Sequence, residues 1–271
     1  MTLPEYLSGG RIQGKTTDTS GDVTTGWNMV NTLNTPNGTT GVFDFGEENN
    51  VTHLGAYDLG SAAGNAWALR FKLVMTQTDG SGGSSDANVI VALSDNETAA
   101  GDEGQDFIGM RVHNAGNNLV RPNHGDNSSP RSGQTGGNQS ITIAEDTNYY
   151  IEIKRTSDTA FTWRFTTNSA FTGGSSGTVS ISAGTVTGLR YIKIMNTGNC
   201  TSCSTFRGYI DDLQYWADGD TTGTATHTLL QLADASKTSI TNVPVGTRYE
   251  EVDTRKIFRR TASAWVEKGT A

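Results

Sequence analysis

The chain has 271 residues, of which 33 are glycine and 18% are charged, a composition that argues against a helical or coiled-coil protein. The formal net charge of −8 argues against a nucleic-acid partner, because phosphate backbones require a basic surface. No window approaches the roughly 18 apolar residues of a membrane span, so we expect no membrane insertion. The segment from Met1 to Tyr6 lacks the basic stretch and apolar core of a secretory signal. We therefore expect synthesis in the cytoplasm without a signal peptide, or a leader that has been removed.

The first third of the chain predicts several short strands and one long one. Brief apolar segments at 11–13, 27–30 and 42–45 each predict a short strand, and the first is expected to pair with the last strands of the domain. Residues 51–59 predict another strand. Apolar residues then occupy every second position of 67–75, which indicates a half-buried strand.

The middle of the chain predicts a central strand and an acidic loop. Residues 89–93 are apolar on both faces, as is typical of a strand that is covered on both sides. Carboxylate and amide side chains crowd the loop 95–106. Residues 107–113 and 119–121 predict further strands, and the Gly- and Ser-rich residues 125–138 predict a long loop.

The next part of the chain predicts a hairpin and the closing strands. Residues 149–154 and 161–166 alternate between apolar and polar side chains and are joined by a short turn, which favours a hairpin. Residues 179–182, 189–195 and 206–216 predict the remaining strands, and no segment predicts a helix. The sequence therefore predicts an all-β protein, an antiparallel jelly-roll β-sandwich.

Two adjacent carboxylates, Asp211 and Asp212, interrupt the last of these strands. Aspartate is depleted in strands and costly when buried without a partner, so both side chains need a cation, hydrogen-bond donors or water. Adjacent strand residues point to opposite faces, so neither this pair nor Glu250 with Glu251 is expected to flank one glycosidic bond. No other hydrolase or phosphate-binding motif is present, and we expect the protein not to be an enzyme.

Five strand motifs follow one another along the chain: Trp67–Phe71, Val91–Asp95, Asp106–Arg111, Tyr149–Arg155 and Gly208–Leu213. Their order resembles that of concanavalin A-like (laminin-G-like) jelly-roll domains. The resemblance covers roughly residues 10–217. It implies the fold more than the function, because that superfamily includes lectins, glycan-binding modules, glycosidases and structural domains.

The last part of the chain has a different character. Residues 244–258 predict a hairpin around Asp253 and Thr254, and residues 264–267 predict a third strand. The phrases Gly246–Glu251 and Trp265–Glu267 are similar to those of short modules at the ends of virion and phage tail or capsid-surface proteins.

We accordingly expect three parts: a concanavalin A-like sandwich at 1–217, a linker at 218–242 and a small C-terminal β-hairpin module at 243–271. The last part has too few large apolar side chains to build a core of its own. It is therefore expected to dock on a larger body or to oligomerise.

An acidic set of residues forms a candidate calcium site, because calcium takes about six to eight oxygen ligands. The resemblance implies that an aspartate of the last strand can contribute to such a site in carbohydrate-binding jelly rolls. The alternative is that these carboxylates accept hydrogen bonds from loop N–H groups, and no cofactor is required in either case. The candidate ligands are Asp95, Asp102, Asp106, Asp211 and Asp212.

Three residues are candidates for glycan contacts, and two for a disulfide. Trp27 lies among polar residues and is a candidate stacking platform, with packing as the alternative. His113 and Asn114, at the end of a predicted strand, complete the set. Cys200 and Cys203 form one Cys-x-x-Cys in a loop and are a candidate disulfide, with two free thiols as the alternative. A structural zinc would require four ligands.

These features together predict a non-enzymatic protein of the virion surface, such as a capsid decoration, spike or fibre component. Its lectin-like jelly roll would serve adhesion, and a surface glycan, other virion proteins and further copies of the chain, such as a trimer, would be its partners. It would be located on the virion or be extracellular after assembly. The alternative is a free carbohydrate-binding module or lectin of an environmental microbe.

Overall fold

The computed structural model describes the chain in separate stretches of residues. These are 11–13, 27–29, 36–37, 42–45, 52–77, 87–99, 104–114, 118–127, 141–196, 207–229, 248–250, 256–260 and 265–270. The chain divides into two compact units, one formed by residues 26–36 and 42–230 and the other by residues 1–25, 37–41 and 231–271. The boundaries expected at 217 and 242 stay predictions.

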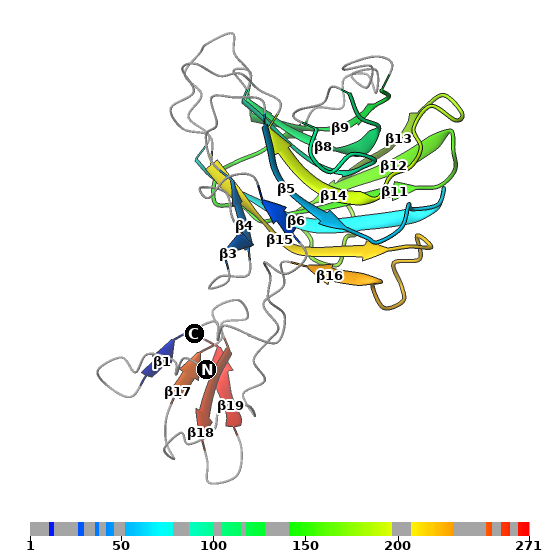
Figure 1. Cartoon of the computed structure of the whole chain (residues 1–271). Helices are drawn as coiled ribbons and strands as arrows, with labels where there is room; N and C mark the ends of the chain where they lie inside the picture. The colour runs from blue at the N-terminus through cyan, green and yellow to red at the C-terminus, as the bar shows by residue number, and fades with distance from the viewer. Residues whose placement is uncertain are drawn as a thin grey trace. The chain divides into compact units, whose positions relative to one another are not determined.

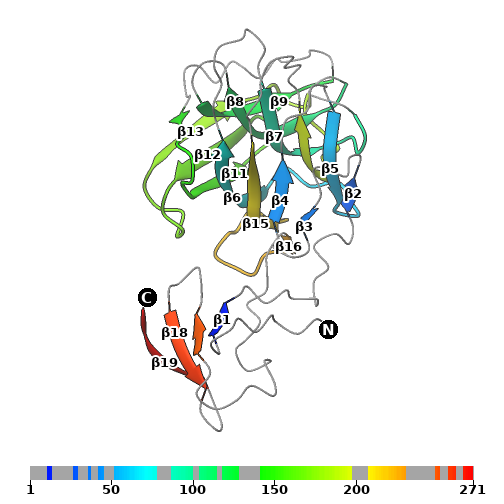
Figure 2. The same cartoon turned by 90° about the vertical axis from the view of Figure 1, so that its left-hand side faces the viewer.

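Two antiparallel sheets form the larger unit (Figures 1 and 2). Sheet I has the order β10 (Ile141–Thr142), β9 (Asn118–Gly125), β8 (Phe107–Asn114), β7 (Ala87–Ser94), β14 (Tyr191–Asn196), β5 (Thr52–Asp58) and β2 (Trp27–Met29). Sheet II has the order β13 (Ser175–Ser180), β12 (Ala160–Thr166), β11 (Tyr149–Arg155), β6 (Trp67–Gln77), β15 (Arg207–Trp216), β4 (Val42–Phe45) and β3 (Pro36–Asn37), and β16 (His227–Leu229) also pairs with β15. The described residues contain no helix. The predicted all-β jelly-roll sandwich is thus confirmed.

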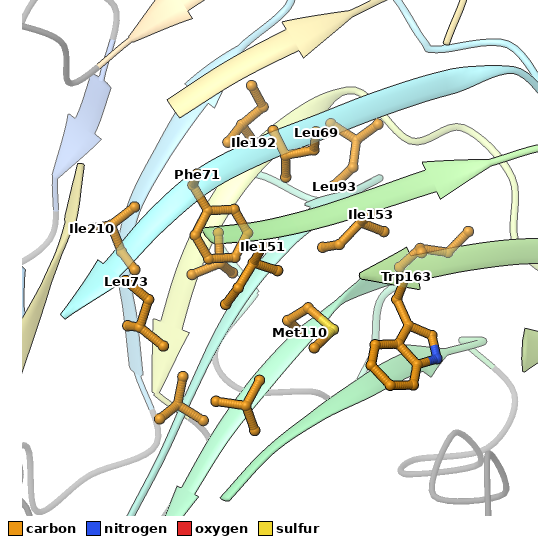
Figure 3. Packing of buried hydrophobic residues seen from close by; sticks show 14 of the residues in the cluster. Leu69, Phe71, Leu73, Leu93, Met110, Ile151, Ile153, Trp163, Ile192 and Ile210 are labelled. Carbon is orange, nitrogen blue, oxygen red and sulfur yellow. The ribbon is translucent and has the colours of Figure 1, made fainter. Parts of the chain in front are cut away.

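The apolar core lies between the two sheets and follows the alternation of the strands (Figure 3). Every apolar side chain at the odd positions of 67–75 is completely buried. On the same inner face, Ile151 and Ile153 of β11 pair with Phe71 and Leu69 of β6. Each large side chain of this kind contributes roughly 2 kcal/mol when it leaves water. A slip of one residue would expose the whole apolar set of the strand, so burial of the inner face fixes the register of the strands.

The strand β7 is buried on both faces, as its composition predicted. Val91 and Leu93 belong to the core between the sheets. Ile90 and Ala92 instead form a second cluster, with Phe107 and Met195, on the outer face of sheet I. The outer face of sheet I is therefore covered where these strands run.

Several elements differ from the sequence prediction. β9 extends to Gly125, well beyond the expected 119–121, because its polar residues pair along the whole of β8. Cross-strand pairing here overrides the low strand propensity of asparagine and proline. β16 lies within the segment that was expected to be a linker.

The smaller unit contains one sheet of the order β1 (Arg11–Gln13), β17 (Arg248–Glu250), β18 (Lys256–Arg260) and β19 (Trp265–Thr270). β17 and β18 pair antiparallel and β19 adds to β18, which confirms the predicted hairpin and third strand. The expectation that residues 11–13 pair with the last strands of the sandwich is wrong, because β1 pairs parallel with β17. Within the described part of the chain, no helix is long and apolar enough to cross a membrane.

We predict that Gly109→Ala destabilises the sandwich by roughly 1–3 kcal/mol. A Cβ at Gly109 would lie 2.5 Å from the Val91 carbonyl oxygen and 2.6 Å from the Ala92 Cβ, in a region where β7 and β8 are already in contact. Urea unfolding measures the loss. The matched control is Gly223→Ala, whose Cβ meets no atom within 4 Å. Equal midpoints for the two variants would contradict the prediction.

Candidate functional site

The outward side chains of sheet II form a surface of charged, amide and aromatic groups, here called the polar face. Its side chains alternate along β6, β11, β12 and β15 with those of the core, and most of them are half-buried. Its members are Arg70, Lys72, Tyr150, Glu152, Lys154, Arg164, Asp211, Asp212 and Gln214, with Phe171 from the loop that joins β12 to β13.

Cross-strand register arranges these side chains in rows. Glu152 lies opposite Arg164 on one side and Arg70 on the other, and Arg70 in turn lies opposite Gln214. Directly opposed residues on one face of a sheet are close enough for their side chains to interact. The rows therefore bring together charges from four strands that are far apart in the sequence.

A bulge in β15 brings Asp212 onto the polar face beside Asp211. Asp211 pairs with Lys72 and Gln214 pairs with Arg70, so β15 advances three residues while β6 advances two. The extra residue is Asp212, whose backbone has a φ of 50°. Asp211 Oδ2 forms an ion pair with Lys72 Nζ, and Asp212 Oδ2 lies 4.0 Å from the same nitrogen.

This geometry corrects one step of the sequence analysis. The expectation that Asp211 and Asp212 point to opposite faces is wrong, because the bulge interrupts the alternation. The argument that two such acids cannot act on one ligand therefore no longer applies to this pair.

Lys72 and Asp211 form the most buried ion pair of the polar face, with side chains 15% and 5% exposed. Burial alone would lower the pKa of Lys72, but the hydrogen bond and charge of Asp211, aided by the charges of Asp212 and Tyr209, raise it above its usual value. Asp211 Oδ1 also accepts a hydrogen bond from the Asp212 N–H at 2.8 Å. The bulge and the ion pair thus support each other.

Arg70 is held on several sides. Its Nε and Nη2 lie 2.6 and 2.5 Å from Glu152 Oε2. Its guanidinium also lies 4.4 Å from the centroid of the Phe171 ring and 5.4 Å from that of the Trp216 ring, within the range of cation–π attraction. The arginine therefore fixes a half-buried aromatic ring beside the charged rows.

The loop that carries Phe171 has a strained backbone. Phe171 has a φ of 55°, a conformation that is rare for a bulky residue. Arg164 Nη1 donates to the Gly173 carbonyl at 2.9 Å, and Thr166 Oγ1 donates to the Thr172 carbonyl at 3.0 Å. The Phe171 ring also meets the Tyr150 ring edge-on, with centroids 5.7 Å apart. The loop is therefore anchored to the polar face by several contacts.

The structure brings together only part of the predicted calcium set. Asp95 Oδ1 accepts a hydrogen bond from the Asp106 N–H at 2.9 Å. The Asp106 carboxylate accepts the N–H groups of Asn127 and Thr187 at 2.9 and 2.8 Å. These two acids lie at the end of sheet I, whereas Asp211 and Asp212 belong to sheet II. Asp102 lies outside the described residues.

Described residues of the acidic loop hold the ammonium group of Lys193. Lys193 Nζ donates to the carbonyls of Asn96 and Ala99 at 3.0 and 2.6 Å and to Gln105 Oε1 at 3.0 Å. Burial lowers the pKa of Lys193 to about 8, although the charges of Asp95 and Glu97 oppose this shift. Among the described residues there is no group of three or more potential metal ligands. Structural calcium stays a prediction.

Sequence reasoning missed Lys193, although a signal was present. A single lysine stands in the middle of the apolar segment 191–195, where an ammonium group needs acceptors. The acceptors come from a loop nearly a hundred residues earlier in the chain. The sequence pattern shows that Lys193 needs hydrogen-bond acceptors, but not which residues provide them.

The strand order places the predicted glycan-contact residues on two strands that are not neighbours, and their role in glycan contacts stays a prediction. Trp27 lies in β2, whereas His113 and Asn114 end β8, and the strands β5, β14 and β7 separate them in sheet I. The side chains of these three residues lie outside the described part of the structure, as do Cys200 and Cys203. The disulfide stays a prediction.

Comparisons with solved structures find similar folds at low identity. The chain is similar to the alginate lyase Aly36B (TM-score 0.45, 16% identity, covering 69% of this chain and 84% of that one). It is also similar to the Emp47p carbohydrate recognition domain (TM-score 0.45, 10% identity, covering 79% of this chain and 93% of that one). A legume lectin-like domain from Entamoeba histolytica is similar as well (TM-score 0.43, 12% identity, covering 72% of this chain and 91% of that one).

No protein-family model matches the sequence, and no curated protein matches it. With TM-scores below 0.5, the structural likenesses assign neither a family nor a function. The function must therefore be argued from the site.

We predict that Lys193→Met destabilises the protein by about 2–4 kcal/mol. The substitution removes the shared donor of two half-buried carbonyls, those of Asn96 and Ala99, and of the buried Gln105 Oε1, which keeps only its hydrogen bond from Ser94 Oγ. The lower cost of burying methionine offsets only part of this loss. Urea unfolding measures the change. Lys154→Met, on the half-exposed polar face, is the matched control and should change stability by less than about 0.5 kcal/mol. Equal losses would show that Lys193 does not anchor the loop.

A second prediction concerns alkaline pH. The pKa of Lys72 is raised in the folded chain, so its contribution to stability is complete below its unfolded pKa of 10.5 and is lost as the pH rises through the folded value. The free energy of unfolding should therefore fall above pH 10.5. In Lys72→Met this part of the alkaline loss should be absent, and stability at pH 7 should be roughly 3–5 kcal/mol lower because Asp211 stays buried without its cation. The same alkaline slope in both proteins would contradict the assignment.

Proposed function

We propose that the protein binds glycans without cleaving them, through the polar face of sheet II. The observation that carries the proposal is the half-buried Phe171 ring, which is held against Arg70 beside a row of carboxylate, guanidinium and amide groups. A flat apolar ring can cover the C–H face of a sugar, while planar polar groups bind its hydroxyls. Such a combination of an aromatic surface with a few convergent polar groups is typical of ligand sites.

Pre-organisation supports the same proposal. Arg70 is fixed by Glu152 and Lys72 is fixed by Asp211, so neither long side chain has to be ordered when a ligand arrives. Ordering a flexible side chain costs roughly 0.5–1.5 kcal/mol on binding. A face that is already ordered can bind a weakly interacting ligand such as a sugar.

The environment of the acids favours binding over hydrolysis. A glycosidase presents two carboxylates to the bond that it cleaves. On the polar face Asp211 is engaged by Lys72 and by the Asp212 N–H, and Glu152 is engaged by Arg70. These contacts use the carboxylates to position cations. The non-enzymatic character expected from the sequence is therefore part of this proposal.

The display of this binding unit on a virion also remains a proposal. It rests on the resemblance of residues 243–271 to terminal modules of virion surface proteins, and the comparisons with known proteins do not support it. The free carbohydrate-binding module or lectin is the alternative that the polar face fits equally well.

We predict that Phe171→Ala weakens glycan binding about tenfold, because roughly 1.5 kcal/mol of apolar contact is lost. A glycan array identifies ligands of the unmodified protein, and titration calorimetry on the best of them measures the loss. Tyr191→Ala is the matched control. The centroid of the Tyr191 ring lies 5.5 Å from the guanidinium carbon of Arg190, so this ring also lies beside an arginine, but it belongs to sheet I. This variant should bind as the unmodified protein does.

Three outcomes would contradict the proposal: no binding on a broad array, equal weakening by both substitutions, or release of reducing sugar from a bound glycan.

A further inference from the structure

The polar face carries more positive than negative charge. Its four cations and three carboxylates are, in that order, Arg70, Lys72, Lys154, Arg164, Glu152, Asp211 and Asp212. This excess is local, because the chain as a whole has a net charge of −8. The polar face therefore differs in sign from the average of the protein.

The positive excess falls on one side of the polar face. Both aspartates lie where β15 pairs with β6. Glu152 is the only carboxylate that the polar face has on β11 and β12, and its Oε2 is engaged by Nε and Nη2 of Arg70. These two strands also carry Lys154 and Arg164. The hairpin of β11 and β12 is therefore the positive side of the polar face.

Lys154 and Arg164 are diagonal neighbours on this hairpin. Arg164 lies directly opposite Glu152, and Lys154 is two residues further along β11 and therefore on the same face. Diagonal neighbours in an antiparallel pair are roughly 7–8 Å apart, within reach of long side chains. One anionic group can therefore interact with both cations.

Both cations offer N–H donors that the protein leaves open. Arg164 donates from Nη1 to the Gly173 carbonyl at 2.9 Å. Within the described part of the chain, its Nε and Nη2 and the Nζ of Lys154 form no hydrogen bond or ion pair, and none of them is a buried nitrogen without a partner. These donors therefore reach solvent, and a ligand displaces no carboxylate of the protein when it binds them.

One exposed acid lies near Lys154. Hydrogen bonds from Thr222 lower the pKa of Asp220, and the charge of Lys154 adds to this shift. The Oδ1 of Asp220 accepts both of these hydrogen bonds, from the Thr222 N–H at 3.0 Å and from the Thr222 hydroxyl at 2.7 Å. Asp220 is thus engaged within its own turn, and Lys154 is available to an anionic ligand.

The open donors lie beside the ring that is proposed to contact the sugar. Gly173, which Arg164 binds, is two residues after Phe171 in the loop between β12 and β13. The Phe171 ring stacks on Arg70, whose partner Glu152 lies opposite Arg164. A sugar that covers the ring can therefore direct a charged substituent toward Arg164.

From this arrangement we infer that the polar face prefers acidic glycans, whose sugars carry a carboxylate or a sulfate, over neutral ones. The inference rests on the proposed glycan binding and specifies its ligand class. Arg164 binds the acidic group through its open Nε and Nη2, and Lys154 adds a second positive charge. Paired N–H donors of an arginine bind a carboxylate by two parallel hydrogen bonds, which are stronger than those between neutral groups.

The test takes the best ligand from the glycan array and compares three forms of the same oligosaccharide, with a hydroxyl, a carboxylate or a sulfate at C6. At least one acidic form should bind about tenfold more tightly than the neutral form, and the preferred form identifies the acidic group. This preference should fall between roughly 50 and 500 mM sodium chloride, because salt screens charges on an exposed face. Titration calorimetry measures the affinities.

Two substitutions test the cause. Lys154→Gln and Arg164→Gln each remove one open cation, so each should reduce the ratio of acidic to neutral affinity about fivefold. Arg190→Gln is the matched control, because it removes the same charge immediately before β14 of sheet I, where Arg190 binds Asp58. It should change the ratio less than about twofold. Thermal unfolding confirms that all three variants are folded.

The outcomes separate the two proposals. Weaker binding of every form by Phe171→Ala, with no acidic form preferred over the neutral one, would overturn the inference and leave glycan binding intact. A preference that Lys154→Gln and Arg164→Gln reduce no more than Arg190→Gln does would also overturn the inference. No binding of any glycan would overturn both proposals.

Discussion

One strand has to bury two apolar residues at a spacing that strand alternation forbids. Ile210 and Leu213 both lie in the core, yet residues three apart on a regular strand face opposite sides. The bulge at Asp212 resolves the conflict by adding one residue to β15. Asp211 already lies opposite Lys72, and the bulge adds Asp212 beside it, so the constraint that completes the core also builds the charged centre of the polar face.

Where one face of a strand is buried and the other solvated, the sequence was sufficient to predict the structure. The strands at 67–75, 149–154 and 161–166 were found by alternation alone, because a one-residue slip would expose the whole apolar set. β9 was underestimated because its pairing with β8 does not depend on an apolar pattern. The odd interval between Ile210 and Leu213 was a visible signal for a bulge, and the assumption of regular alternation concealed it.

The sequence predicted that the acidic side chains need counter-charges, but not which residues supply them. Acids in a strand and in a tight loop require positive charge, and calcium was one way to provide it. The structure places one ammonium group at each of these two acidic segments, and both ammonium groups come from distant strands. Their surroundings have opposite effects: burial dominates at Lys193 and lowers its pKa, whereas the carboxylate of Asp211 outweighs burial at Lys72 and raises it. Single-sequence patterns do not contain such long-range pairings.

The polar face also maintains backbone strain, and only part of this strain is explained by the core. Three described non-glycine residues have a positive φ, and two of them, Phe171 and Asp212, lie on this face. Each such residue costs on the order of 1–3 kcal/mol and persists only where its surroundings enforce it. The bulge explains Asp212, since Leu213 must reach the core. Phe171 has no such reason, because its ring stays half-buried on the outside, stacked on Arg70. Strain that holds an aromatic ring on the outer face, against Arg70 and Tyr150 and away from the core, is in line with the glycan contact proposed for Phe171.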